Sequence, residues 1–429
     1  MGNAAAAMQD IRKIGAASMV GTTLEYYDFA VYNSLAAIVF NRIFFPSFDP
    51  LSGTILAFST FAVGYLARPA GGIVFGRMGD RHGRRLVLMT TLIIMGVTTA
   101  LMGVLPAYAT VGILSPILLV TLRFVQGTAL GGEWAGAVLL SLEHGAADRR
   151  GRNASWAQVG PSLGTLLATG LIAVIAWGTS PEEFLAWGWR APFLASVLLV
   201  AFGVWIRTGV EETPAFADLH VRHATAKAPI AEVIRDHWRR LLIAGGARIG
   251  ADVMYSLLIV FTLTYLTTVL HQSRALALTA VSIGAAVNAL CVPYFGALSD
   301  RRGRRTVYGA GALLSIAWAV VFFRILDTLS PLPIVLAVAS GFVMHAMMYG
   351  PQAAFITEQF PARVRYAGSS MAYTLVGIIG GGLAPVMFAT ILRAYGTTFG
   401  ISLYLVGALC VTGIALIMAR ETSHVPLES

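Results

Sequence analysis

Long apolar runs recur along the whole sequence and restrict the folds that are open to it. Twelve such runs lie near residues 16–40, 54–78, 86–106, 115–141, 155–178, 191–208, 241–270, 276–298, 306–326, 333–357, 367–394 and 399–419. A helix needs about 20 mostly apolar residues to cross a bilayer, and the runs are of this length. Only 12% of the residues are charged, against about a quarter in soluble domains. We therefore predict an all-α membrane protein with twelve transmembrane helices.

Arginines are distributed unevenly between alternate loops. Most lie in the two terminal segments and near 77–85, 149–152, 207–240, 301–305 and 363–365, whereas the opposite loops hold few, namely Arg42, Arg190, Arg274, Arg324 and Arg393. Cytoplasmic loops carry the basic excess in membrane proteins, so we expect both termini in the cytoplasm. The net charge of +9 then reflects topology, and no nucleic-acid partner is expected. Because the first residues lack the pattern of a cleaved signal, the first span is expected to direct its own insertion.

One loop motif occurs twice, once after the second span of each half. GRMGDRHGRR begins at Gly76 and GALSDRRGRR begins at Gly296, so both match G-x-x-x-D-R-x-G-R-R. Duplicated halves of this kind are typical of transporters with parallel repeats. We predict an N-terminal six-helix half at 1–208, a cytoplasmic linker at 209–240 and a C-terminal six-helix half at 241–429.

The residue types of the repeated motif suit a gate between helices. Glycine permits a tight turn, and aspartate accepts hydrogen bonds from arginine or from a helix N-terminus. A topology anchor without a gating role is the alternative. The candidate gating residues of the two loops are Gly76, Asp80, Arg81, Gly83, Arg84, Gly296, Asp300, Arg301, Gly303 and Arg304. Five residues after the fourth and tenth spans are expected to form salt bridges with these loops: Glu143, Arg149, Glu358, Arg363 and Arg365.

The repeated loop resembles the signature of the major facilitator superfamily. Six further stretches resemble its metabolite:proton symporter family, found in bacterial inner membranes: EYYDFAVY (25–32), ARPAGG (67–72), LRFVQGTALGGEWAGA (122–137), AWGWRAPF (186–193), EETPAF (211–216) and EQFPARVRYAG (358–368). The resemblance covers essentially the whole chain and implies the major facilitator fold, an inner-membrane location and proton-coupled transport. That family handles shikimate, α-ketoglutarate, citrate, proline and betaine, so the resemblance leaves the substrate open.

Ionisable residues inside the spans are candidates for function, because charge is costly in hydrocarbon. Glu25 and Asp28 share a face of the first helix at spacing i, i+3. Two carboxyl groups this close are not expected to be ionised together, so one of them can carry a proton. Arg123 in the fourth span keeps its charge and needs a counter-ion, for which Asp28 or Glu25 is the expected partner. The resemblance implies a proton switch formed by Asp28 and Arg123; a purely structural ion pair is the alternative.

Other polar residues in the spans complete the candidate site. Glu133 is a further candidate for proton coupling, and a hydrogen bond to a neighbouring helix is the alternative. Arg248 and Asp252 are spaced i, i+4 and can pair, with Arg248 attracting an anionic substrate; snorkelling of Arg248 to the membrane surface is the alternative. Arg123 is also a candidate substrate-binding residue. The others are Tyr32, Gln126, Gln158, Tyr255, Asn288, His345, Tyr349, Gln352 and Tyr373.

These features favour a proton-coupled symporter that imports a small carboxylate, such as a shikimate-like cyclic acid or a dicarboxylate. A symporter for a zwitterionic osmolyte of the proline or betaine type and an exporter are the alternatives. The sequence has no Walker loop, zinc-type His and Cys spacing or nucleophile elbow, so we expect no enzyme activity, cofactor or metal. A receptor is disfavoured because no long signalling loop is present. The expected partners are the substrate, protons and lipid, and the chain is expected to be a monomer.

Overall fold

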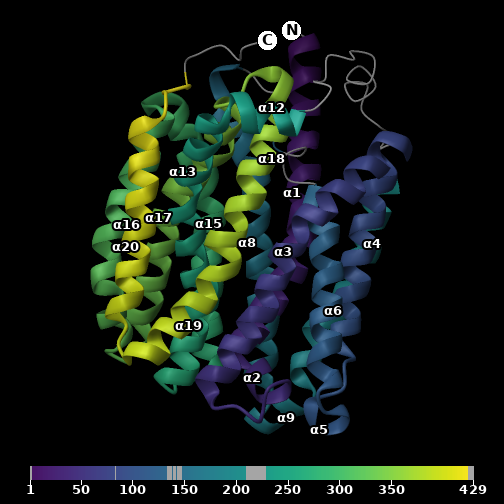
Figure 1. The fold of residues 1–429 in the computed structure, drawn as a ribbon, viewed down its shortest axis with the longest axis vertical. Coiled ribbons are helices and arrows are strands. Elements are labelled where there is room, and N and C mark those ends of the chain that lie inside the picture. The colour runs from purple at the N-terminus through teal and green to yellow at the C-terminus, as the bar shows by residue number, and fades with distance from the viewer. Residues whose placement is uncertain are drawn as a thin grey trace.

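The computed structural model is a bundle of long helices that run roughly side by side (Figure 1). It describes residues 2–82, 84–132, 138, 142, 147–208 and 229–423. Within these ranges no β-strand is present. The all-α prediction is therefore confirmed.

The first six spans are mostly single helices. They are α1 (Gly2–Ile38), α3 (Pro50–His82), α4 (Arg84–Gly103), α6 (Leu114–Ala129), α8 (Arg150–Gly178) and α10 (Ala191–Thr208). Short helical pieces lie in the connections: α2 (Phe40–Ile43), α5 (Tyr108–Val111), η1 (Leu130–Gly132), η2 (Ala147–Arg149), α9 (Pro181–Ala186) and η3 (Gly188–Arg190).

The last six spans include two that are interrupted. The eighth, ninth, tenth and twelfth are α15 (Arg274–Arg302), α16 (Arg304–Leu326), α17 (Pro331–Glu358) and α20 (Phe399–Met418), and α12 (Pro229–Asp236) precedes the seventh. The seventh comprises α13 (Trp238–Ser256), η4 (Leu257–Phe261), α14 (Thr262–Thr264) and η5 (Tyr265–Val269). The eleventh comprises η6 (Ala362–Val364), α18 (Arg365–Val376), η7 (Gly377–Leu383) and α19 (Ala384–Tyr395). Segments η4, η5 and η7 are π-helical, a form that occurs often at functional sites.

The surface of the bundle suits a bilayer. Eight helices in the described part of the chain are long and apolar enough to cross a membrane, and three shorter apolar helices accompany them. Large apolar side chains such as Leu198, Leu290 and Ile417 are exposed on the outside. Such exposure is unfavourable in water, but in a membrane these side chains contact lipid tails.

The two ends of the bundle differ. Helix α1 begins and α20 ends at the same end, where α12 also lies, and we call it the terminal end (Figure 1). The opposite end holds α2, α5 and α9. Helices of the two predicted halves pack against each other in the middle, α8 against α15 and α3 against α19 and η7. Residues from both halves therefore meet at the centre.

Candidate functional site

Arg123 on α6 is fully buried beside α1. Its guanidinium carbon lies 4.1 Å from the ring centroids of both Phe29 and Tyr32, and Nη1 donates a hydrogen bond to Gln126. The Gln126 amide donates in turn to the Thr99 hydroxyl at 2.6 Å. Cation–π contacts are strongest away from water, so the two rings stabilise the buried charge.

Asp28 and Glu25 are also buried on α1. Asp28 forms a hydrogen bond with Thr99 and interacts electrostatically with Arg123. Among the described residues, however, no carboxylate forms an ion pair with Arg123, whose Nε and Nη2 atoms have no hydrogen-bond partner. The predicted direct ion pair is therefore not formed in this conformation. The Arg123 guanidinium contacts the Phe29 and Tyr32 rings and the Gln126 amide oxygen instead.

Arg248 on α13 forms the predicted pair with Asp252. Its Nε lies 2.8 Å from Asp252 Oδ2, and Nη1 donates to the Tyr373 carbonyl at 2.7 Å. The Tyr373 ring covers the guanidinium at 3.2 Å. Because Arg248 is only 4% exposed, snorkelling is not observed. Tyr373 also joins the two halves, since its hydroxyl lies 2.9 Å from that of Tyr26 on α1.

Arg68 on α3 is a third buried arginine, which we did not predict. Its guanidinium lies 3.9 Å from the Tyr65 ring centroid and 4.9 Å from that of Phe29. In the part of the chain that the structure describes, its Nε and Nη2 atoms have no hydrogen-bond partner. The signal was present, because Arg68 lies inside the apolar run at 54–78. The centre of the bundle therefore holds Arg68 as well as Arg123 and Arg248.

His345 on α17 lies between two tyrosine rings. The Tyr255 and Tyr349 rings each stack on it with centroids 5.0 Å away. The Asn288 amide nitrogen lies 3.1 Å from His345 Nδ1. An amide nitrogen can only donate, so Nδ1 accepts and the ring proton of the neutral imidazole lies on Nε2. The Asn288 amide oxygen accepts from Ser162 of α8 at 2.7 Å, which connects this cluster with the first half.

The other predicted site residues have separate places. Gln352 donates to the Tyr308 hydroxyl at 2.7 Å, so it stabilises packing inside the second half. Gln158 on α8 is fully buried. Tyr32 shares a hydrogen bond with Thr60 of α3. Glu133 lies outside the described residues.

The space at the centre is very small in this conformation. It is lined by rings and small residues of both halves, among them Tyr26, Phe29, Tyr65, Thr165 and Tyr255. Its volume is about 20 Å³, which is close to the room that one water needs. A metabolite therefore does not fit until the helices move.

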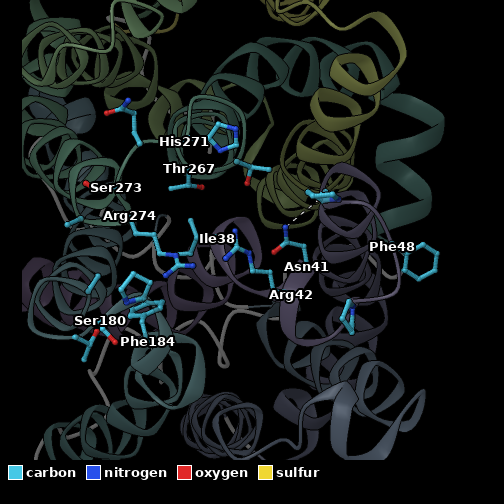
Figure 2. A pocket seen from close by; sticks show the side chains of 18 residues that line it. Ile38, Asn41, Arg42, Phe48, Ser180, Phe184, Thr267, His271, Ser273 and Arg274 are labelled. Carbon is cyan, nitrogen blue, oxygen red and sulfur yellow. Dashed lines mark hydrogen bonds between the residues drawn. The ribbon is translucent and has the colours of Figure 1, made fainter.

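A larger cavity of about 710 Å³ lies at the opposite end of the bundle (Figure 2). It is lined by the connections between α1 and α3, between α8 and α10, and between η5 and α15. Arg42 and Arg274 lie within it, together with His271. This end is therefore hollow, while the centre is closed.

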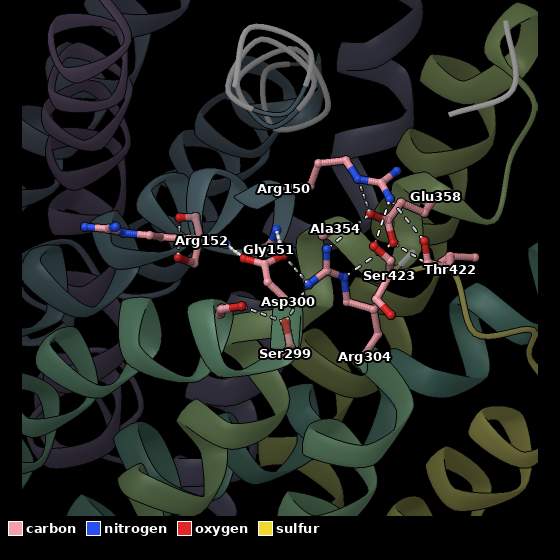
Figure 3. A network of polar contacts seen from close by, with 12 residues as sticks. Arg150, Gly151, Arg152, Ser299, Asp300, Arg304, Ala354, Glu358, Thr422 and Ser423 are labelled. Carbon is pink, nitrogen blue, oxygen red and sulfur yellow. Dashed lines mark hydrogen bonds and ion pairs between the residues drawn. The ribbon is translucent and has the colours of Figure 1, made fainter. Parts of the chain in front are cut away.

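The terminal end is closed by a polar network between the halves (Figure 3). Asp300 at the end of α15 accepts hydrogen bonds from the backbone N–H groups of Gly151 at 2.8 Å and Arg152 at 2.9 Å. These belong to the first turn of α8, where a negative charge is stabilised by the helix dipole. Arg304 holds Asp300 from the other side, with Nη1 2.7 Å from Oδ1. The predicted role of this aspartate as a helix-end acceptor is therefore supported.

Glu358 extends the network to α17 and to the end of the chain. Its Oε1 lies 3.4 Å from Arg150 Nε and 3.4 Å from Arg304 Nη2. The Thr422 hydroxyl donates to its Oε2 at 2.6 Å. Arg150 also donates to the carbonyls of Thr422 and Ser423 at 3.1 Å. We call Arg150, Gly151, Asp300, Arg304, Glu358 and Thr422 the terminal network.

Glycines allow the close approach at this end. A side chain on Gly296 would place Cβ 2.7 Å from Ser155 Cβ, so α15 and α8 meet here without intervening side chains. Gly303 connects α15 to α16 with a φ of +91°, a conformation that suits glycine. The predicted tight turn is present.

Several predicted gating residues have other partners. Arg149 is exposed and pairs with Asp148 at 3.6 Å, and Arg363 pairs with Glu232 of α12 at 2.5 Å. Their expected salt bridges with the repeated loops are therefore not observed; Arg150 is turned inward instead of Arg149. Arg365 is buried and donates to the Phe360 carbonyl at 3.2 Å, whereas Arg301 is exposed. Outside the described residues or side chains are Gly76, Asp80, Arg81, Gly83, Arg84 and Glu143.

The sequence matches a family model described as Major Facilitator Superfamily over residues 18–385 and 247–427. The chain belongs to this superfamily. It is 38% identical over 417 residues to the shikimate transporter of Escherichia coli strain K12, covering 96% of this chain and 95% of that protein. It is 32% identical to the proline/betaine transporter of Salmonella typhimurium strain LT2, covering 97% of this chain and 85% of the relative.

Solved structures of the superfamily share the fold. A partially occluded inward open conformation of the xylose transporter XylE from E. coli matches with a TM-score of 0.74 and 17% identity, covering 97% of this chain and 99% of that one. The D-xylose-proton symporter matches with a TM-score of 0.73 and 18% identity, covering 97% and 98%. The major facilitator fold of twelve transmembrane helices is thus confirmed. The protein is a multi-pass membrane transporter of a small molecule and not an enzyme.

Proposed function

We propose that this transporter is a proton-coupled symporter that imports a small carboxylate across a bacterial inner membrane. The observation that carries the proposal is that two of the three arginines buried at the centre lack a carboxylate at ion-pair distance among the described residues. Arg68, Arg123 and Arg248 are all buried there, but within the described residues only Arg248 has a carboxylate at ion-pair distance. An unpaired buried cation is costly, and a substrate carboxylate would supply the missing charge.

The neighbouring rings suit a cyclic substrate. Tyr255, His345 and Tyr349 form a stack, and Tyr349 interacts electrostatically with Arg248. The proton on His345 Nε2 can donate to a substrate hydroxyl. The relative named as a shikimate transporter supports a hydroxylated cyclic acid. A dicarboxylate is also compatible with the site, because each of its carboxylates could pair with one arginine.

Asp28 is the proposed proton-binding residue, with Glu25 and Glu133 as further candidates. When Asp28 is protonated, Arg123 has no anionic partner and can bind the substrate carboxylate. When the proton leaves, the Asp28 carboxylate attracts Arg123 and competes with the substrate. Loading and release of the two ligands are thereby coupled.

Movement of the two halves would carry the substrate across. The halves are proposed at 1–208 and 241–429, joined by a linker at 209–240. Because basic residues mark the cytoplasmic side, the terminal end faces the cytoplasm and the opposite end faces the periplasm. The terminal network closes the cytoplasmic side in this conformation, and its separation would open it. We propose that a single chain performs the cycle.

A zwitterionic osmolyte is the second candidate substrate. Aromatic faces attract quaternary ammonium groups, and Tyr26, Tyr65 and Tyr373 lie at the centre beside the Arg248–Asp252 pair. The proline/betaine relative supports this candidate. Arg68 and Arg248 already cover two of these rings, however, which leaves less room for a second cation. Export instead of import is the remaining alternative.

A ligand screen tests the substrate class. Shikimate, succinate and glycine betaine would each be added to the purified protein while its melting temperature is measured. We expect a carboxylate to raise the melting temperature and betaine to leave it unchanged. Stabilisation by betaine alone would favour the zwitterion, and the absence of any effect of carboxylates at high concentration would refute the proposed substrate class.

A further inference from the structure

The cavity at the opposite end, which we call the vestibule, has a one-sided charge. Its described lining contains Arg42, His271 and Arg274 but no carboxylate. Polar groups without charge complete it, among them Asn41 and Gln272. Clefts lined by charge of one sign concentrate ligands of the opposite sign.

The two vestibule arginines face the same space from different connections. Figure 2 shows the Arg42 and Arg274 side chains directed toward each other across the cavity. Arg274 lies over the Phe184 ring, with its guanidinium carbon 5.3 Å from the centroid. It is repelled by Arg42 and attracted by Glu182, yet no ion pair or hydrogen bond of either arginine side chain occurs in the described part of the structure. Both guanidinium groups are therefore available to an anion.

The vestibule is separate from the central site. Thr264 of α14 donates a hydrogen bond to the Ala37 carbonyl of α1 at 3.0 Å. Ile38 and Thr267, which follow the two contact residues along the chain, line the vestibule. Asn33 and Val260, which precede them, line the central space. The contact thus lies between the two spaces along both helices. An anion held by Arg42 and Arg274 does not touch the central arginines.

We propose that the vestibule is an anion-binding site that captures the small carboxylate substrate before it enters the centre. The proposal rests on the proposed function, because it assigns the first stop on the import path. A carboxylate between two guanidinium groups can accept paired N–H donors from each. Release inward requires the contact between Thr264 and Ala37 to separate. Capture at the vestibule therefore precedes binding at the centre.

Binding of shikimate to the purified full-length protein tests this site. Saturation-transfer NMR detects weak binding, and Arg248→Ala would weaken binding at the central site. We expect the shikimate signal to persist in the Arg248→Ala protein. Adding Arg42→Gln and Arg274→Gln to this protein should lower the shikimate signal by about threefold or more. About 0.5 M NaCl should also lower the signal, because salt screens exposed charges. Arg324→Gln is the matched control, since Arg324 is an exposed arginine at the same end that does not line the cavity.

The outcomes separate this proposal from the transport proposal. Loss of the signal in Arg248→Ala alone, or full retention after both vestibule substitutions, would overturn the vestibule site. A signal that depends on Arg42 and Arg274 supports it, even if the wild-type protein shows no proton-driven uptake, which would instead contradict the proposed function. Unchanged melting temperatures of the two variants would show that they are folded, as expected because neither side chain has a polar partner to lose among the described residues.

Discussion

Arg68, Arg123 and Arg248 are buried in one bundle, and each guanidinium lies against aromatic ring faces. Arginine does not lose its charge in proteins, and the ring faces stabilise these buried cations. Asp252 balances Arg248 directly. Asp28 lies near Arg123 but forms its hydrogen bond with Thr99. At the residue scale, the centre holds three buried guanidinium groups, and Asp28 is the carboxyl group that we propose exchanges a proton.

Replacing Asp28 with Asn should uncouple transport from the proton gradient. The amide cannot ionise, so Arg123 would have no competing carboxylate and the exchange of substrate across the membrane would persist. We expect gradient-driven accumulation in proteoliposomes to fall to background, while counterflow exchange remains. Full active uptake by the variant would refute the assignment, and Glu25→Gln measured in parallel shows which of the two carboxyl groups titrates.

Arg248→Lys should weaken transport even though the charge is kept. Arg248 Nε forms an ion pair with Asp252, and Nη1 donates a hydrogen bond to the Tyr373 carbonyl. A lysine cannot reproduce this planar geometry. A hydrogen bond to a charged group contributes about 1.5–3 kcal/mol, so uptake should fall by about tenfold or more. The matched control is Arg393→Lys, because Arg393 forms only a surface pair with Asp49 at 3.7 Å. Equal uptake by both variants would exclude a geometric role for Arg248.

The sequence predicts contacts within one helix better than contacts between helices. The Arg248–Asp252 pair follows from its i, i+4 spacing, and the structure confirms it. The partners of Arg123 depend on how α1, α3 and α6 rotate against one another, which spacing does not determine. Arg68 was missed for a similar reason, since an arginine in an apolar run reaches either the membrane surface or the bundle interior.

At the scale of elements, the ends and interruptions of helices are the notable features. Asp300 of the second half caps α8 of the first, so a helix end forms part of the contact between halves. Thr264, on the short α14 between two π-helical segments, contacts α1. The seventh span is therefore irregular where it meets the first. Apolar periodicity predicts a span but not a π-helical turn inside it.

Asp300→Asn should favour opening of the terminal end. The amide loses the negative charge that the first turn of α8 and Arg304 stabilise. Spin labels at the exposed positions Arg149 and Arg302 would report the distance between α8 and α15. We expect longer distances between the two labels in Asp300→Asn. The distances should be unchanged in the control Asp148→Asn, whose carboxylate is exposed. An unchanged distance distribution would show that Asp300 does not hold this end closed.

Glu421 should make the stability of the terminal end pH-dependent. Burial opposes ionisation of its carboxyl group, but hydrogen bonds from the backbone N–H groups of Arg305 and Arg304 outweigh burial and hold its pKa below the ordinary value. A lowered pKa in the folded state gives stability above the usual glutamate range near 4.3, which is lost as the pH falls through the folded pKa. Glu421→Gln should destabilise the protein at pH 7 by about 1 kcal/mol, which would be measured as a lower melting temperature. The difference between variant and wild type should shrink as the pH falls below about 4.3. A pH-independent difference would contradict this account; the exposed Glu182→Gln is the control.

At the scale of the whole molecule, the terminal end is closed, the centre is too small for a metabolite and the opposite end is hollow. The number of spans follows from the sequence, because each apolar run must cross the bilayer. Which end is closed does not follow from the sequence, since one sequence can adopt more than one conformation. The whole arrangement fits a carrier that exposes its central site to one side at a time.

Proton-driven uptake of shikimate distinguishes a coupled carboxylate importer from the alternatives. Proteoliposomes containing the purified protein would be given shikimate outside and a pH gradient that is acid outside. We predict that shikimate accumulates above its external concentration and that a protonophore abolishes the accumulation. Accumulation that ignores the gradient, or uptake of betaine with no uptake of shikimate or succinate, would contradict a proton-coupled carboxylate symporter.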